Sequence, residues 1–256
     1  MGNLIKMERY KLFHNIIFWV LLIGMPILGL ISGSGYRQYY LAHVAKTIPI
    51  ESFSGTFNAM IADSLIILVA ICGLLGWFIG REFSTRTISA EVASGNNRFK
   101  IFLSKTIVYL AAFNSIMLLY SLMGAIGEIR YWGTGNLGNN ILNILRTGIY
   151  TVIFQSVLYL IVITLAFILR SGLKTAIAGP IVSFGIMIAF ASTMTSDLPT
   201  TFNFINPMYR FREITAMGSH FTSQNAINAP ALLVAVVWIA ACSIIIWKSF
   251  AKSDLK

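Results

Sequence analysis

Acidic side chains are scarce in this sequence: 9 of 256 residues are Asp or Glu, and charged residues of both signs make up only 11%. A soluble domain carries about 25% charged residues. Because 57% of the residues are apolar and the mean hydropathy is +0.76, the chain has too few polar side chains to coat a surface in water. The same hydropathy excludes a disordered chain. We therefore expect most of this protein to lie in lipid.

Cysteine and histidine are also rare. Cys72 and Cys242 both lie inside apolar runs, whereas a disulfide scaffold needs more cysteines, placed in loops. We interpret both as small buried apolar residues. His14, His43 and His220 are spread over separate segments, so we predict no metal site on this chain.

The sequence motifs of soluble enzymes are absent. The sequence has no G-x-x-x-x-G-K-[ST] phosphate-binding loop, no H-E-x-x-H or C-x-x-C metal pattern and no G-x-S-x-G nucleophile turn. We therefore predict that the chain is not an enzyme, has no catalytic residues, binds no ATP through such a loop and holds no cofactor of its own.

Six apolar runs are each long enough to cross a bilayer, which takes roughly 20 helical residues. They are Asn15–Gly33, Met60–Gly80, Ile107–Gly127, Ile149–Leu169, Ala176–Thr195 and Ala229–Trp247. The runs do not alternate as barrel strands do, and helices then satisfy the backbone in lipid. The sequence predicts an all-α membrane protein with six transmembrane helices in one domain, residues 1–256. Asp63 is the one charged residue in these runs.

Lys and Arg set the expected orientation. With a cytoplasmic N-terminus, 13 basic residues fall in inside segments and 6 in outside loops, so the positive-inside rule predicts that both termini are cytoplasmic. The inside set is Lys6, Arg9, Lys11, Arg81, Arg86, Arg98, Lys100, Lys105, Arg170, Lys174, Lys248, Lys252 and Lys256. The net charge of +10 is therefore a topology signal. No soluble basic face indicates a nucleic-acid partner.

The segment Arg81–Lys105 follows the second run at the expected cytoplasmic face. Ser84 or Thr85 is expected to cap a short helix that ends at Gly95, with Ile88 and Val92 on one side. Asn97 is expected to cap the next helix. Such a helix suits docking to a partner protein, and it equally suits contact with anionic membrane lipid.

This segment resembles the first cytoplasmic loop of type-2 ABC exporter permeases, which carries a pattern like E-[YF]-x-x-G-T-[IL] … S-x-x-S-R-x-x-[LIF] … K. The chain has Glu82-Phe83, Thr87-Ile88, Ser94, Arg98-Phe99 and Lys105 at similar spacing. Arg86 stands where the family has glycine, and Asn97 where it has serine. Six spans with both termini inside also fit the family. The chain is particularly similar to the small permeases of bacteriocin, lantibiotic and bacitracin self-protection systems.

The resemblance implies a multi-pass permease in the bacterial cytoplasmic membrane, which expels antimicrobial peptides or lipid-like compounds. It implies cytoplasmic ABC ATPase partners that carry ATP and Mg, and a second permease, in a homodimer or a paralogous heterodimer. The segment would be the coupling helix that meets the ATPase, through Arg81, Glu82, Thr87, Ile88, Glu91, Val92 and Arg98. The alternative is a membrane scaffold or sensor that transports nothing, and ATP-dependent substrate movement would separate the two.

The last outer loop is aromatic. Asn206 can cap a helix that ends at Gly218, and the family resemblance implies a re-entrant outer helix here. Together with Asp63, four aromatic residues are candidates for the substrate path: Phe202, Phe204, Tyr209 and Phe211. Aromatic rings of this kind prefer the headgroup level of a membrane.

Two small-residue motifs predict close helix packing. Gly29-x-x-x-Gly33 closes the first run and Gly76-x-x-x-Gly80 the second. These motifs are compatible both with helix packing within the chain and with a helix–helix interface between two copies in a dimer. The family's permeases begin with an amphipathic helix, but charged and apolar residues interleave over residues 4–12, so no clean apolar face is predicted.

Overall fold

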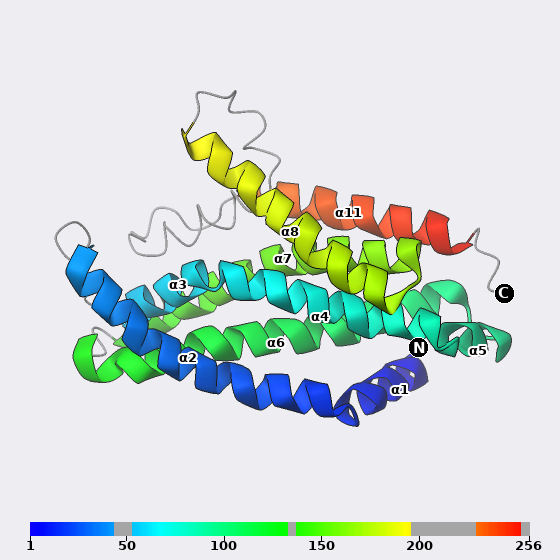
Figure 1. Cartoon of the computed structure of the whole chain (residues 1–256), viewed down its shortest axis with the longest axis horizontal. Coiled ribbons are helices and arrows are strands. Elements are labelled where there is room, and N and C mark those ends of the chain that lie inside the picture. The colour runs from blue at the N-terminus through cyan, green and yellow to red at the C-terminus, as the bar shows by residue number, and fades with distance from the viewer. Residues whose placement is uncertain (44–52, 133–136, 196–228, 252–256) are drawn as a thin grey trace.

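The computed structural model describes residues 1–43, 53–132, 137–195 and 229–251, and these ranges are helical throughout apart from short links and turns (Figure 1). The helices are α1 (Gly2–Phe13), α2 (Ile16–His43), α3 (Phe53–Asp63), α4 (Leu65–Ser84), α5 (Thr87–Ala93), α6 (Arg98–Trp132), α7 (Leu137–Leu169), α8 (Gly172–Thr195) and α11 (Ala229–Ala251). The all-α prediction is confirmed for the described part of the chain.

Five helices are long and apolar enough to cross a membrane, namely α2, α4, α6, α7 and α11. The expected fifth run lies in α8, where the apolar stretch Gly172–Ile188 is shorter than the other five. The helical bundle and its apolar helices are thus established. The count of six spans and their orientation stay predictions.

The expected second run does not form one helix. It begins in α3 and crosses a turn at Ser64, where α3 ends and α4 begins. The Ser64 hydroxyl donates to the Ile61 carbonyl oxygen at 2.7 Å. Such a local hydrogen bond from a serine side chain to the backbone competes with the backbone hydrogen bonds of a regular helix. The prediction of a continuous helix over Met60–Gly80 was therefore wrong at its first turn.

Glycine lets α2 pack closely along α6. A Cβ atom added at Gly29 would lie 2.2 Å from the Tyr120 carbonyl oxygen, and one at Gly33 would lie 2.8 Å from that of Gly124. Both positions therefore require glycine as they stand. The first small-residue motif is used for packing within the chain.

The second motif brings α4 against the start of α8. A Cβ atom at Gly76 would lie 2.9 Å from the Thr175 carbonyl oxygen, and one at Gly80 would lie 2.8 Å from that of Ser171. Here too the glycines serve contacts within one chain. Both α2 and α8 continue as helices across their internal prolines, Pro26 and Pro180.

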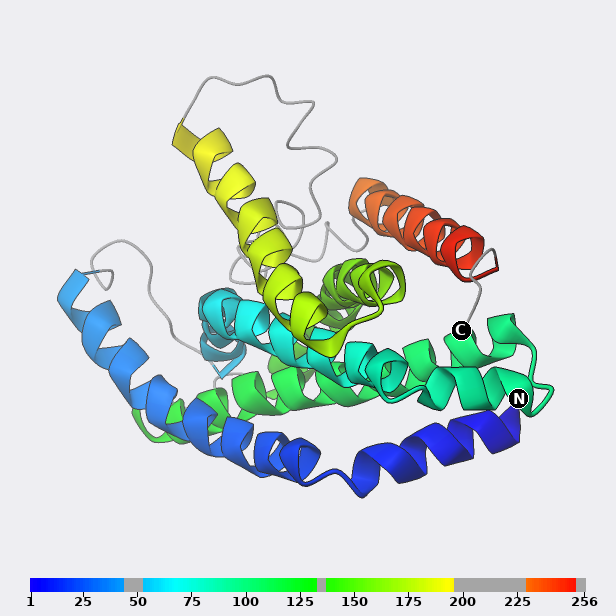
Figure 2. The ribbon, with the colours of Figure 1, turned by 45° about the vertical axis from the view of Figure 1, so that its right-hand side comes forward.

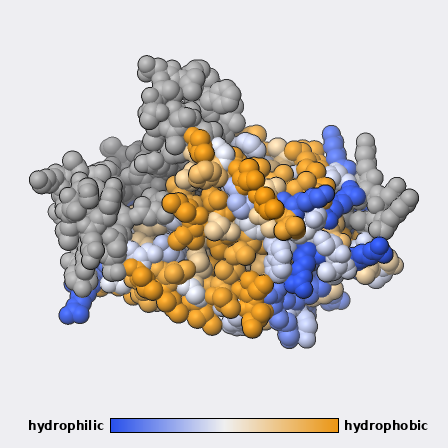
Figure 3. All heavy atoms as spheres, in the orientation of Figure 1, coloured by the Kyte–Doolittle hydropathy of each residue, from blue (hydrophilic) through white to orange (hydrophobic). Residues whose placement is uncertain are grey.

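The segments predicted to be cytoplasmic meet at one end of the bundle, called here the α5 end (Figures 1 and 2). The Gly172 N–H at the start of α8 donates to the Ser84 hydroxyl at 3.2 Å. The Trp247 ring near the end of α11 lies 5.6 Å from that of Phe99. Figure 3 shows a hydrophobic middle, and hydrophilic residues gathered where α1 and α5 lie.

Candidate functional site: a buried ion-pair network at the α5 end

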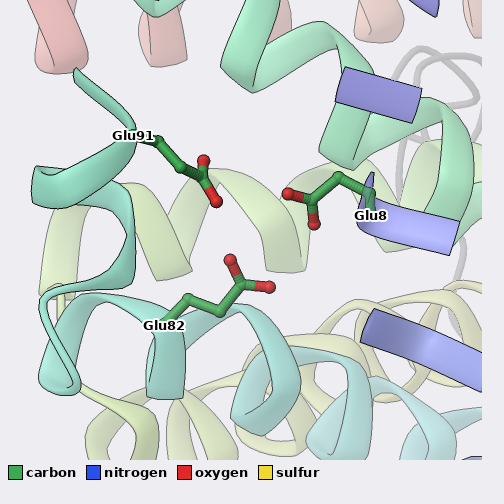
Figure 4. Close-up of side chains that lie close together, drawn as sticks. All are labelled: Glu8, Glu82 and Glu91. Atoms are coloured by element: carbon green, nitrogen blue, oxygen red, sulfur yellow. The ribbon is translucent and has the colours of Figure 1, made fainter. Parts of the chain in front are cut away.

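Four helices contribute ionisable side chains to one buried cluster, called here the ion-pair network: Glu8, Lys11, Glu82, Glu91 and Lys105. The Lys105 side chain is fully buried at its centre. Its Nζ lies 2.8 Å from Glu8 Oε1 and 3.2 Å from Glu91 Oε1. It also pairs with Glu82 Oε2. Figure 4 shows the three carboxylates converging from separate helices. One ammonium group therefore joins α1, α4, α5 and α6.

Lys11 and Tyr109 provide the other contacts of the three carboxylates. Lys11 Nζ lies 3.2 Å from Glu8 Oε1 and pairs with Glu91 Oε1; its side chain is 30% exposed, so it is the part of the network nearest to water. The Tyr109 hydroxyl donates to Glu82 Oε1 at 2.8 Å. Burying charges is costly unless each is paired and hydrogen-bonded, and these partners meet that requirement for most of the network.

The network explains why the first helix has no clean apolar face. Its buried residues are Leu4, Glu8 and Leu12, which are spaced four apart and therefore lie on one side. A charged residue stands in the middle of the buried stripe because its partners lie on other helices. Residues Gly2–Phe13 thus form a helix, α1, although their sequence pattern does not identify it.

The pKa of the Glu8 carboxyl group is clearly shifted by its surroundings in the network. Burial raises its pKa above the ordinary value of 4.5, the nearby Glu82 carboxylate raises it further, and Lys105 opposes both. In the described part of the chain, Oε2 of Glu8 and Oε2 of Glu91 are buried without a hydrogen-bond partner.

The geometry of the three carboxylates would also suit a cation. One oxygen from each of Glu8, Glu82 and Glu91 lies within 4.8 Å of the other two. The Lys105 ammonium pairs with all three carboxylates, however, so the site already has its cation. We therefore assign no metal to it.

The short helix predicted after α4 forms, as α5, and Gly95 follows its end with a left-handed backbone as expected. The expected N-cap was wrong. Ser84 is the last residue of α4 and Thr85 follows it, where the Thr85 hydroxyl donates back to the Arg81 carbonyl oxygen at 3.0 Å. Arg86 takes the N-cap position of α5 without a side-chain cap. The Asn97 cap is confirmed, since its Oδ1 accepts from the Phe99 N–H at 2.9 Å.

Arg86 has a left-handed backbone with φ 58°, a conformation that glycine adopts without steric cost and other residues disfavour. The exporter pattern has glycine at this position. The chain therefore makes a left-handed turn between α4 and α5 at a residue that is not glycine.

The residues predicted to couple to an ATPase divide into two groups. Ile88 and Glu91 are buried, and Glu82 is half-buried in the network, so these face the protein itself. Thr87, Val92 and Arg98 are half-buried, and Arg81 is exposed, with its guanidinium 5.2 Å from the Trp77 ring centroid. Arg86, Ala90 and Ala93 are among the exposed positions on and beside α5.

The predicted substrate-path residues are not among those whose side chains the structure describes. Phe202, Phe204, Tyr209 and Phe211, with the expected re-entrant helix, lie outside the described residues, as does the side chain of Asp63. The third run was expected to end at Gly127, but α6 continues to Trp132, and Glu128 is 2% exposed because it packs against Gly33 of α2.

Comparison of the sequence with known protein families and with curated proteins finds no match. The class of the protein therefore rests on its own fold and site. The described chain is an all-helical bundle whose apolar helices fit a multi-pass membrane protein, with an ion-pair network at one end.

The sequence motif contains Glu82 and Lys105, and Glu91 was predicted as a residue of the coupling helix, but Glu8, Lys11 and Tyr109 were missed. A signal for Glu8 was present. It is an acidic residue at the centre of an apolar i, i+4 stripe in a chain with only 9 acidic residues. Its partners lie up to 97 positions away, and no periodicity within one helix identifies such partners.

Proposed function

We propose that this chain is the transmembrane permease subunit of an ATP-driven exporter of the type-2 ABC class. The observation that carries the proposal is the attachment of α5. This helix lies at the polar end of the bundle and is joined to α1, α4 and α6 through Glu91 and Lys105. A force applied to α5 would therefore act on two of the long apolar helices at once.

The substrate class follows from the resemblance of Arg81–Lys105 to the immunity-type permeases. We propose export of antimicrobial peptides or amphipathic, lipid-like compounds, with ATP and Mg on a separate ATPase subunit and with a second permease in the complex. Phe202–Phe211 and Asp63 are the proposed contacts for substrate. The complex would lie in the bacterial cytoplasmic membrane, with the α5 end in the cytoplasm.

The geometry refines which residues would meet the ATPase. Ile88, Glu91 and Glu82 hold α5 in place, so the docking surface would be its exposed side, at Arg86, Ala90 and Ala93. A double substitution of Glu82 and Arg98 would not test docking cleanly, since the Glu82 carboxylate pairs with buried Lys105.

The test is purification of the tagged full chain from cells that carry its gene, followed by identification of bound proteins and measurement of ATP hydrolysis. Ala90→Arg places a large charge on the exposed side of α5, and we expect it to abolish co-purification of the ATPase. Asn3→Arg, also at an exposed position of the α5 end, is the matched control. Absence of any ATPase from the wild-type preparation would refute the proposal and favour the scaffold or sensor alternative.

A further inference from the structure

A cavity of about 390 Å³ lies between α1, α2 and the first half of α6. Phe13, Phe18 and Leu22 line one side, and Ile107, Ala111 and Ser115 line the other. The small side chains of Ala111 and Ser115 leave the space open. The Ser115 hydroxyl donates to the Ala111 carbonyl oxygen of its own helix at 2.7 Å, so it presents no unsatisfied donor to the cavity.

Among the described residues that line this cavity, Arg9 is the one charged side chain. It is exposed and has no ion pair within the described part of the chain. It lies on α1, on the polar side of Ile107, where the third expected span begins. A cation therefore stands beside an apolar cavity at the predicted cytoplasmic end of the third expected span.

A second cavity of about 630 Å³ shares Ser115 with the first and extends past Leu118 and Leu122, with Ile149 and Gly148 of α7 on its other side. From Ile107 to Ser115 the helix rises about 12 Å, close to the roughly 15 Å of one hydrocarbon leaflet.

We propose that the Arg9 cavity holds one acyl chain of an anionic phospholipid from the leaflet at the α5 end, with the lipid phosphate paired to Arg9. The apolar lining and the length of the cavity match a chain, and the unpaired guanidinium matches a phosphate in charge and in hydrogen-bond geometry. The proposal does not depend on transport, since a lipid bound here would brace α1 against α6 in any membrane protein of this fold.

The experiment uses the full chain, purified in detergent and incubated with equal amounts of phosphatidylglycerol and phosphatidylcholine with identical chains. Native mass spectrometry measures which lipid is retained. We expect the wild-type chain to retain phosphatidylglycerol preferentially. Arg9→Gln should lower that retention about fivefold, which corresponds to about 1 kcal/mol for one basic residue near the membrane surface. Lys6→Gln changes an exposed lysine of the same helix that does not line the cavity, and it should retain lipid as the wild type does.

The apolar part of the site has its own variant. Ala111→Leu fills the cavity, and we expect it to lower phosphatidylglycerol retention about tenfold if two methylene groups of the chain are displaced. Ala240→Leu on α11 is the matched control at an exposed alanine. Melting temperatures in lipid-free detergent establish that each variant is folded.

Equal retention of the two lipids by the wild-type chain would overturn the proposal. So would loss of lipid in Lys6→Gln to the same degree as in Arg9→Gln, because the attraction would then belong to the whole basic surface. If Ala111→Leu fails to fold, the comparison of Arg9→Gln with Lys6→Gln decides the matter alone.

Discussion

Lys105 Nζ lies 2.8 Å from Glu8 Oε1, although 97 positions separate the two residues in the chain. Both side chains are fully buried. The contact fixes the first helix of the protein to the start of α6, and through Glu82 and Glu91 it fixes α4 and α5 as well. Loss of this ammonium group leaves three carboxylates together, with Lys11 as the one remaining ammonium group of the network.

We therefore expect Lys105→Met to lower the free energy of unfolding by about 3–5 kcal/mol, the range for removing one partner of a buried ion pair. The measurement is the melting temperature of the purified protein in detergent. Lys100→Met is the control on the same helix, at an exposed position, and should change stability by less than about 0.5 kcal/mol. Similar melting temperatures for the two variants would contradict the buried network.

The raised pKa of Glu8 predicts a pH dependence of stability. Because the folded state holds the Glu8 proton more tightly than the unfolded state, stability falls as the pH rises from 4.5, the ordinary value, through the raised pKa. The slope is at most about 1.4 kcal/mol per pH unit. Glu8→Gln has no such proton, so the wild type should lose stability relative to this variant as the pH increases. If the wild type instead became more stable than Glu8→Gln as the pH increased, ion pairing with Lys105 would lower the pKa of Glu8 by more than burial raises it.

The close approach of α2 and α6 predicts opposite results for two glycines of one helix. An added Cβ atom at Gly29 meets backbone at 2.2 Å, whereas one at Gly24 meets nothing within 4 Å. Gly29→Ala should force the helices apart and destabilise the protein by about 1–3 kcal/mol. Gly24→Ala should be neutral or stabilising by up to about 1 kcal/mol, since alanine favours helix. Thermal unfolding of the two variants checks this, and equal destabilisation would argue against the packing described.

The left-handed backbone of Arg86 predicts a preference for glycine at this position. Arg86→Gly should be more stable than Arg86→Ala by about 1 kcal/mol, because alanine retains the Cβ conflict. At Ala90, in the regular part of α5, the order should reverse, and Ala90→Gly should cost about 1 kcal/mol. Denaturant unfolding of these three variants measures both differences. If Arg86→Ala matched Arg86→Gly, the turn before α5 would not be left-handed in solution.

The distribution of Lys and Arg predicts which side of the membrane each loop faces. In a background without Cys72 and Cys242, a cysteine at Thr134 should react with an impermeant thiol reagent applied to whole cells. One at Asn96, beside α5, should react only after the membrane is opened. Labelling of Asn96 from outside would invert the orientation and remove α5 as a docking site for a cytoplasmic ATPase.

The sequence by itself determined that the chain folds into apolar helices, because long runs without charge have no other way to satisfy their backbone groups in lipid. It also located α5 and the Asn97 cap, since capping depends on residues close in sequence. It did not locate the turn at Ser64, because serine side chains serve both helix interiors and turns. Gly29 and Gly76 could be identified as packing residues, but their partners could not.

Only the tertiary structure decided how Glu8, Glu82, Glu91 and Lys105 are used. Each is an ordinary surface residue by type, and its burial depends on partners from other helices. The same holds for Ile88, which the pattern places on the apolar side of α5 and the structure buries completely. Helix formation depends on neighbours a few residues apart, whereas the burial of a charge is tolerated only where an opposite charge arrives from a distant part of the chain.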